Sequence, residues 1–237
     1  FESPESYNGI MLIYGSILFA FQIYGDFSGY SDIAIGVAML FGFSLMTNFK
    51  TPYFSRDIPE FWRRWHISLS TWFRDYVYIP LGGNRGSKQL LIRNIFITFI
   101  LSGLWHGANW TFIFWGLINA IYCLPELLSN RNKKNIRFKS ENNQVPKLSD
   151  TFSILLTFSM ICFSWIFFRA DNLQEAFQYI NFLLFNKFYD SGINFIRMIP
   201  ILFIFIVIEW ISRNKKIVLD ISNNIFINRS FTLFVII

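Results

Sequence analysis

The sequence of 237 residues is 53% hydrophobic and 20% aromatic, with only 15% charged residues and a mean hydropathy of +0.38. Soluble domains have roughly 25% charged residues. The composition therefore excludes a disordered chain, a collagen-like fibre and a disulfide-stapled miniprotein, and it indicates an integral membrane protein. A net charge of +6 is typical of basic cytoplasmic loops in such a protein, and no nucleic-acid-binding motif accompanies it.

Four apolar regions follow one another along the chain, over residues 10–46, 90–128, 152–168 and 195–211. A helix needs roughly 20 residues to cross about 30 Å of hydrocarbon, so the third and fourth regions each predict one span. The first is interrupted by GDFSGYSD at residues 25–32, which contains two carboxylates and two glycines. We expect this segment to be a loop between two half-spans or a polar turn packed inside the protein.

The second apolar region is expected to break near its centre. Residues 50–93 and 131–147, on either side, are rich in Lys and Arg, and the positive-inside rule places both in the cytoplasm. A region that starts and ends on one side crosses twice or turns back, and the turn would fall in SGLWHGANW, residues 102–110. Because residues 94–101 form only about 12 Å of helix, this predicts a re-entrant or broken helix around His106. If residues 50–93 are themselves embedded, the region is instead one tilted span.

His106 is the first candidate catalytic residue. The chain has only two histidines, and histidine is the side chain that exchanges a proton near neutral pH. An ionisable group at membrane depth is expensive and tends to be functional. Asn109, three residues later, carries an amide suited to orienting the ring or binding an oxyanion. The alternative is a structural histidine bonded to a carbonyl in the helix break.

The second histidine, His66, lies in FWRRWHISLSTWFRDYVYIPLGG, residues 61–83, which mixes tryptophans with basic residues. On a continuous helix its apolar positions form one aromatic stripe, made of Trp62, Trp65, Leu69 and Trp72. Such an amphipathic helix is typical of the membrane interface. The alternative is a site for an anionic ligand such as a phosphorylated coenzyme, because Arg binds phosphate bidentately. The candidate binding residues here are Arg63, Arg64, Trp65, Arg74 and Asp75.

Other kinds of site are not indicated. Asp26 and Asp32 are six residues apart and do not share a helical face, so polar packing is favoured over an acid–base pair. The sequence has no G-x-S-x-G, HExxH or Cys/His cluster, which speaks against a serine nucleophile and against a metal site. Cys123 and Cys162 lie in apolar runs and are expected to be buried. The residues alone therefore suggest base-catalysed transfer without a metal.

Four motifs resemble those of membrane-bound O-acyltransferases, and most of all those of the bacterial alginate O-acetyltransferase branch. They are YGDFSGYSDIAIG at 24–36, NFKTPY at 48–53, FWRRWHISLSTWFRDYVYIPLGG at 61–83 and SGLWHGANWTFIFWG at 102–116. The resemblance implies an all-α, polytopic membrane bundle in which residues 1–237 belong to one embedded domain and residues 24–116 form its motif-bearing core. We also expect further helices before this piece and an extension after it, because the family's members are longer.

The resemblance implies functional roles as well. His106, in the LWHG context, would be the catalytic histidine, and His66, in the RRWH context, the second signature histidine. The reaction implied is transfer of an acyl group from a cytoplasmic thioester, with acetyl-CoA as the expected donor, to hydroxyls of an exported polysaccharide. An SGNH-hydrolase-type partner often completes this transfer. The expected setting is the lipid bilayer of the bacterial inner membrane, with no nucleic acid and no permanently bound cofactor.

Three alternatives stay open from the sequence. The acyl group could be D-alanine from a carrier protein rather than acetyl. The chain could be a proton-coupled transporter in which the intramembrane His and Asp residues relay protons, although the internal repeat that often marks transporters is not found. It could also be a membrane scaffold without catalysis, in which case substitution of either histidine would leave acylation intact.

Overall fold

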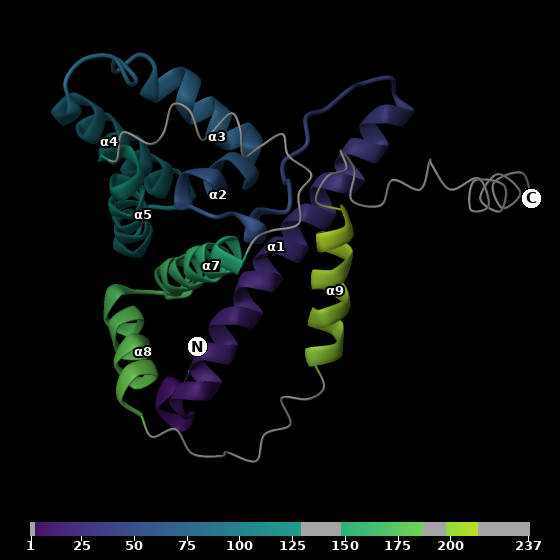
Figure 1. The fold of residues 1–237 in the computed structure, drawn as a ribbon, viewed down its shortest axis with the longest axis vertical. Helices are drawn as coiled ribbons and strands as arrows, with labels where there is room; N and C mark the ends of the chain where they lie inside the picture. Colours follow the sequence, from purple (N-terminus) through teal and green to yellow (C-terminus); the bar gives the residue numbers. More distant parts are fainter. Residues whose placement is uncertain (1–2, 129–147, 187–197, 213–237) are drawn as a thin grey trace, which may run out of the picture. The chain divides into compact units, whose positions relative to one another are not determined.

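The computed structural model describes residues 3–128, 148–186 and 198–212. The chain divides into two compact units, Phe1–Ile193 and Asn194–Ile237. The described residues form helices and turns and contain no strand, which confirms the all-α class (Figure 1). Three of their helices are long and apolar enough to cross a membrane: α1 (Gly9–Leu40), α5 (Trp110–Leu128) and α7 (Leu148–Arg169).

Helix α1 runs without interruption for 32 residues, so the predicted break at residues 25–32 is wrong. The segment lacks proline, and its polar residues need no turn, because Asp26 and Asp32 are exposed on the helix surface while Tyr24 and Ser31 face the protein. A Cβ at Gly25 or Gly29 would have no neighbour within 4 Å. These glycines are therefore tolerated within the helix and do not mark a tight turn or a close contact.

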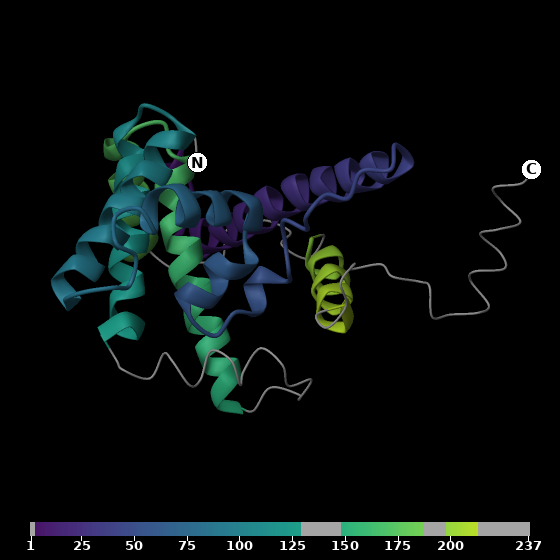
Figure 2. The ribbon, with the colours of Figure 1, turned by 90° about the horizontal axis from the view of Figure 1, so that it is seen from above.

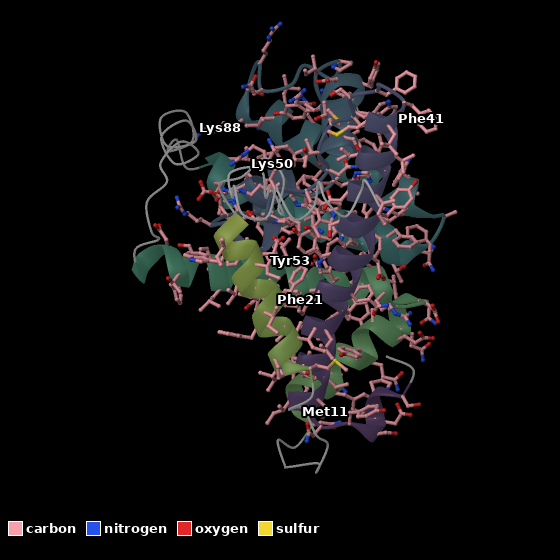
Figure 3. All side chains as sticks on the ribbon, turned by 90° about the vertical axis from the view of Figure 1, so that its right-hand side faces the viewer. Met11, Phe21, Phe41, Lys50, Tyr53 and Lys88 are labelled. Carbon is pink, nitrogen blue, oxygen red and sulfur yellow. The ribbon has the colours of Figure 1, made fainter. Side chains whose placement is uncertain are left out.

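Helix α1 ends in a glycine cap that turns the chain back along it. Gly42 adopts a φ of 79°, and the amides of Gly42 and Phe43 donate to the carbonyls of Met39 and Ala38 at 3.0 and 2.9 Å. The returning segment, residues 43–51, leads to a one-turn 3-10 helix, η2 (Pro52–Phe54). The ring of Tyr53 in η2 packs with its centroid 5.6 Å from that of Phe21 (Figure 3).

Residues 58–78 do not form one amphipathic helix. They form α2 (Ile58–Arg64), α3 (Ile67–Phe73) and a π-helical turn (Arg74–Tyr78), so the predicted continuous aromatic stripe is wrong. Because the helix breaks between α2 and α3, the tryptophans diverge: Trp65 is 4% exposed in the core, whereas Trp72 is 48% exposed. That this part of the chain lies at the membrane interface stays a prediction.

Helix α4 (Lys88–His106) and helix α5 form a hairpin that turns at residues 107–109. The predicted helix break at His106 is therefore confirmed. Helix α4 is longer than the sequence suggested, about 28 Å for its 19 residues. Two glycines let the helices touch: a Cβ on Gly103 would overlap the backbone of Phe112, and a Cβ on Gly116 would overlap that of Phe99.

Helix α7 packs against α5 and α1, and α8 (Leu173–Phe185) packs back against the first half of α1 (Figures 1 and 2). Tyr179 of α8 fixes this contact, because its hydroxyl donates to the carbonyl of Leu12 at 2.6 Å and lies 3.3 Å from the Ser16 hydroxyl. The predicted third span thus appears as α7. Of the predicted fourth span, the structure describes α9 (Ile199–Ser212), an apolar helix of 14 residues in the second unit.

The glycine contacts between α4 and α5 predict a large difference between glycine positions. Gly103→Ala should lower the free energy of unfolding by about 1–3 kcal/mol, because the added methyl meets backbone that cannot rotate away. Gly29→Ala is the matched control; it lies in open space on α1 and should be neutral or stabilising by up to about 1 kcal/mol. Thermal unfolding in detergent measures both. Equal melting temperatures for the two variants would contradict the close helix contact.

Candidate active site

Both histidines line a cavity of about 470 Å³. Its wall is built from α1, α2, α3, the π-helical turn, α4, α5 and α7, so it lies where most helices of the first unit meet. The wall is mainly aromatic, and its polar groups are few. Besides His66 and His106 they include Ser70, Arg74, Tyr78, Thr98 and Ser102. A largely apolar cavity with a few convergent polar groups is the usual form of a small-molecule site.

His66 reaches the cavity because the backbone bends at this residue. Its φ is 43°, in the left-handed region that few non-glycine residues adopt. Asn48 holds this bend from the returning segment after α1: its carbonyl accepts the amide of Ile67 at 2.9 Å, and its side-chain Oδ1 accepts the amide and hydroxyl of Ser68 at 3.2 and 2.6 Å. Asn48 thus caps the start of α3 and fixes the direction of the imidazole.

The surroundings of His66 keep its ring neutral. Its edge meets the ring of Phe27 at a centroid distance of 4.6 Å, and Nδ1 lies 3.4 Å from the hydroxyl of Ser68. Burial lowers the pKa of His66 below its ordinary value of 6.5, because the charged form loses hydration. At neutral pH this side chain therefore accepts or donates hydrogen bonds without a formal charge.

His106 is the last residue of α4 and is enclosed by aromatic rings. The ring centroids of Trp105, Phe168, Trp115 and Phe112 lie 4.9, 5.0, 5.3 and 6.2 Å from the centroid of its imidazole. Trp105 also lies 6.2 Å from His66, so one indole contacts both histidines. None of the hydrogen bonds between described residues holds the His106 ring nitrogens in a fixed role. An imidazole in this position is available to a substrate in the cavity.

Only two of the predicted binding residues line the cavity, Trp65 and Arg74. Trp65 contributes a buried wall between α1 and α7, with its ring 5.9 Å from Tyr24 and 5.2 Å from Trp165. The Arg74 side chain is 59% exposed and forms a bidentate pair with Asp75, with Nε–Oδ1 and Nη2–Oδ2 distances of 2.7 and 3.2 Å. Arg74 therefore marks an open edge of the cavity, and Asp75 reaches the site only through Arg74.

Arg63 and Arg64 lie outside the cavity wall. Arg63 is nearly half exposed and pairs with Asp57 at 4.0 Å. Arg64 pairs with Glu60 at 2.6 Å and donates to Thr51 at 3.4 Å, which ties α2 to the returning segment. These contacts give the two arginines a local structural role, and the structure does not bring them to the histidines.

Asn109 is also absent from the cavity wall. Its Oδ1 accepts the amide of Thr111 at 3.1 Å, which caps α5, and its Nδ2 donates to the carbonyl of Asp171 at 2.7 Å. With both polar groups engaged, Asn109 fastens the turn after His106 to the end of α7. Orientation of the imidazole through the backbone fits this geometry better than direct contact with an oxyanion.

Sequence reasoning missed the wall that α5 and α7 contribute. Trp115 and Trp165 stack at 5.9 Å and are 1% and 2% exposed, and Phe168 lies beside both and beside His106. Trp115 lies within the motif at 102–116 but was not assigned a role, whereas Trp165 and Phe168 sit in an apolar run of a sequence with 30 Phe and 8 Trp, where nothing in the pattern distinguishes them. The described residues contain no group of three or more His, Cys, Asp or Glu suited to a metal ion.

Comparison with known proteins matches this chain to one family. The sequence profile of the membrane-bound O-acyltransferase family matches residues 3–170. The probable alginate O-acetylase AlgI of Pseudomonas aeruginosa is 46% identical over 164 residues, which are 69% of this chain and 29% of that protein. The peptidoglycan O-acetyltransferase of Helicobacter pylori is 41% identical over 176 residues, 74% of this chain and 32% of that protein.

A more distant relative is the teichoic acid D-alanyltransferase of Streptococcus thermophilus, 35% identical over 174 residues, which are 68% of this chain and 41% of that protein. The aligned residues thus span between 29% and 41% of the length of these relatives. The chain belongs to the membrane-bound O-acyltransferase family. Both histidines and all four motifs that suggested this family lie within the matched residues.

The position of Asn48 predicts a graded effect on the site. Asn48→Ala removes the acceptor for two groups of Ser68, at a cost of about 1–3 kcal/mol, and should lower acyl transfer roughly tenfold by releasing the bend at His66. Asn48→Asp is the matched control, because one carboxylate oxygen keeps the acceptor for Ser68 and the other can accept from the Ser31 hydroxyl that Nδ2 now faces. Transfer rates per amount of folded protein in membranes provide the measurement. Equal losses in the two variants would show that Asn48 does not act by accepting these hydrogen bonds.

Proposed function

We propose that the complete protein transfers an acetyl group from a cytoplasmic thioester, such as acetyl-CoA, to hydroxyls of an exported polysaccharide. The single observation that carries this proposal is the convergence of both histidines on one apolar cavity in a chain of this family. The relatives named as O-acetylating enzymes are 41–46% identical, against 35% for the D-alanyltransferase, which favours acetyl over D-alanyl.

The chemistry proposed needs one base and one carbonyl. His106 accepts the proton of the acceptor hydroxyl while the hydroxyl oxygen attacks the thioester carbonyl carbon. The tetrahedral intermediate then collapses, the carbon–sulfur bond breaks, and the thiolate takes the proton back from the imidazolium. The products are the O-acyl ester and a free thiol. General base catalysis of this kind contributes typically 10²–10⁴-fold to the rate.

The exposed edges of the cavity suggest how two substrates approach. Arg74 and Tyr78 lie on the part of the wall formed by the π-helical turn. A guanidinium there is suited to the phosphates of a coenzyme. Trp105 is 57% exposed and contacts both histidines, so its side of the cavity is the other edge that the described residues leave uncovered. We assign the Arg74 edge to the donor and the Trp105 edge to the acceptor, with the neutral His66 orienting one of them by a hydrogen bond.

The setting proposed is the inner membrane of a bacterium, with the protein spanning it several times. The three long apolar helices favour a membrane location, and the bacterial relatives favour a bacterial source. The acyl group reaches the polysaccharide directly or through an SGNH-hydrolase-type partner whose hydroxyl accepts it on the far side. Acetyl-CoA acts as a substrate here, and no resident cofactor enters the reaction.

The central test compares the complete wild-type protein with His106→Ala and His66→Ala in membranes supplied with radiolabelled acetyl-CoA. The wild type should move label into polysaccharide. His106→Ala should lower this transfer by 10²–10⁴-fold, and His66→Ala should lower it less while weakening apparent donor or acceptor affinity. A folded wild type that leaves acetyl-CoA intact but accepts D-alanine from a carrier protein would replace acetyl by D-alanyl in the proposal.

The pH profile tests the neutral state of His66. Because burial lowers the pKa of His66, its imidazole stays unprotonated as the pH falls through 6.5. No loss of transfer rate from His66 protonation should therefore occur near pH 6.5, and the acid limb should appear only at lower pH. The measurement is the wild-type rate from pH 5 to 8 at saturating donor, with His66→Gln as the comparison that has no titrating group at position 66. A fall in the wild-type transfer rate near pH 6.5 that is absent from His66→Gln would contradict the buried, neutral ring.

A further inference from the structure

The wall beside His106 consists of rings that are already in contact with one another. Phe168, on α7, has its ring centroid 5.0 Å from His106, 5.4 Å from Trp115 and 5.2 Å from Trp165. Phe112, behind the cavity wall, lies 5.1 Å from Phe168. Edge-to-face rings at these distances are in van der Waals contact. No gap wide enough for an alkyl chain remains between His106 and α7.

The position of a reacting carbonyl brings its acyl group against this wall. The carbonyl carbon must lie about 3–3.5 Å from the hydroxyl oxygen that His106 activates. The thiol side of the donor extends towards the exposed Arg74 edge, and the hydroxyl approaches past the exposed Trp105. The remaining substituent of the carbonyl carbon, the acyl tail, then faces the part of the wall that neither of these edges occupies, and there Phe168 is a cavity-lining ring of α7 with its centroid 5.0 Å from His106.

We propose that Phe168 determines the length of the acyl group, admitting acetyl and excluding chains of four or more carbons. This inference rests on the proposed function. Its physical basis is a rigid wall: the hydrogen bond from Asn109 to the carbonyl of Asp171 ties the turn after His106 to the chain just beyond Phe168. Withdrawal of the end of α7 from His106 would break this link, and the neighbouring rings of Trp115 and Trp165 restrict the Phe168 side chain itself. Each methylene that a hydrophobic site must reject changes the rate by roughly 10-fold or more.

The test measures transfer from acetyl-, propionyl-, butyryl- and hexanoyl-CoA by the complete protein in membranes, both as released thiol and as acyl ester in polysaccharide. Phe168→Ala should raise the ratio of hexanoyl to acetyl transfer by about tenfold or more. Phe168→Leu should raise the ratio of butyryl to acetyl transfer, but by less than Phe168→Ala does. Phe168→Trp should lower the rates with the longer donors further. Size-exclusion chromatography in detergent confirms that each variant is folded.

Phe163→Ala is the matched control. Phe163 lies on the same helix, is 38% exposed and does not line the cavity, so its removal should leave the donor ratios unchanged. A non-reactive hexyl-CoA thioether provides a reading that does not depend on turnover, because it should inhibit acetyl transfer by Phe168→Ala at roughly tenfold lower concentration than for the wild type.

The outcomes separate the two proposals. A wild type that transfers no acetyl group from acetyl-CoA overturns the proposed donor, and with it this inference. A wild type that transfers acetyl and hexanoyl groups equally well overturns the role of Phe168 alone. The role of Phe168 is also overturned if a folded and active Phe168→Ala keeps the wild-type donor ratios, or if Phe163→Ala shifts these ratios as much as Phe168→Ala does.

Discussion

The close contact of α4 with α5 is the constraint on which the site depends. Gly103 and Gly116 allow each helix to touch the other's backbone, and the chain turns back immediately after His106. A larger residue at either glycine would force the helices apart. The separation would move His106 away from Trp115, which comes from the opposite arm of the hairpin and lies 5.3 Å from the imidazole. Packing of small residues thus sets the position of the candidate base.

The second histidine depends on a different kind of constraint. His66 occupies a backbone conformation that costs free energy by itself, and the hydrogen bonds of Asn48 offset this cost. The segment that contains Asn48 is in turn held by α1, since Asn48 Nδ2 lies 3.4 Å from the Ser31 hydroxyl. The unbroken second half of α1 therefore helps to support the bend at His66.

Sequence reasoning predicted the helix break at His106 correctly, but it placed a break at residues 25–32 where α1 is continuous and missed the one between α2 and α3. The helix break at His106 could be predicted because glycines and a charge pattern flank it. The break at His66 could not, because its cause is Asn48, a residue of another segment whose hydrogen bonds leave no trace in helical periodicity. Arg63 and Arg64 looked like ligands by composition, yet nearby carboxylates pair with them, Asp57 six residues before Arg63 and Glu60 one turn before Arg64. Phe168 carries no signal at all, being one of 30 phenylalanines.

The aromatic enclosure also restricts the order of proton movements in the proposed reaction. An imidazolium ion surrounded by the rings of Trp105, Trp115 and Phe168 has lost most of its hydration, so its charge is costly. Cation–π attraction from the same rings returns only part of this cost. The charged form of His106 is therefore tolerable only while the negative charge of the oxyanion or the departing thiolate lies next to it. Proton uptake by His106 is thus expected to coincide with formation of the oxyanion, and return of the proton with departure of the thiolate, so that water is not needed to solvate a free imidazolium at the buried side of the ring.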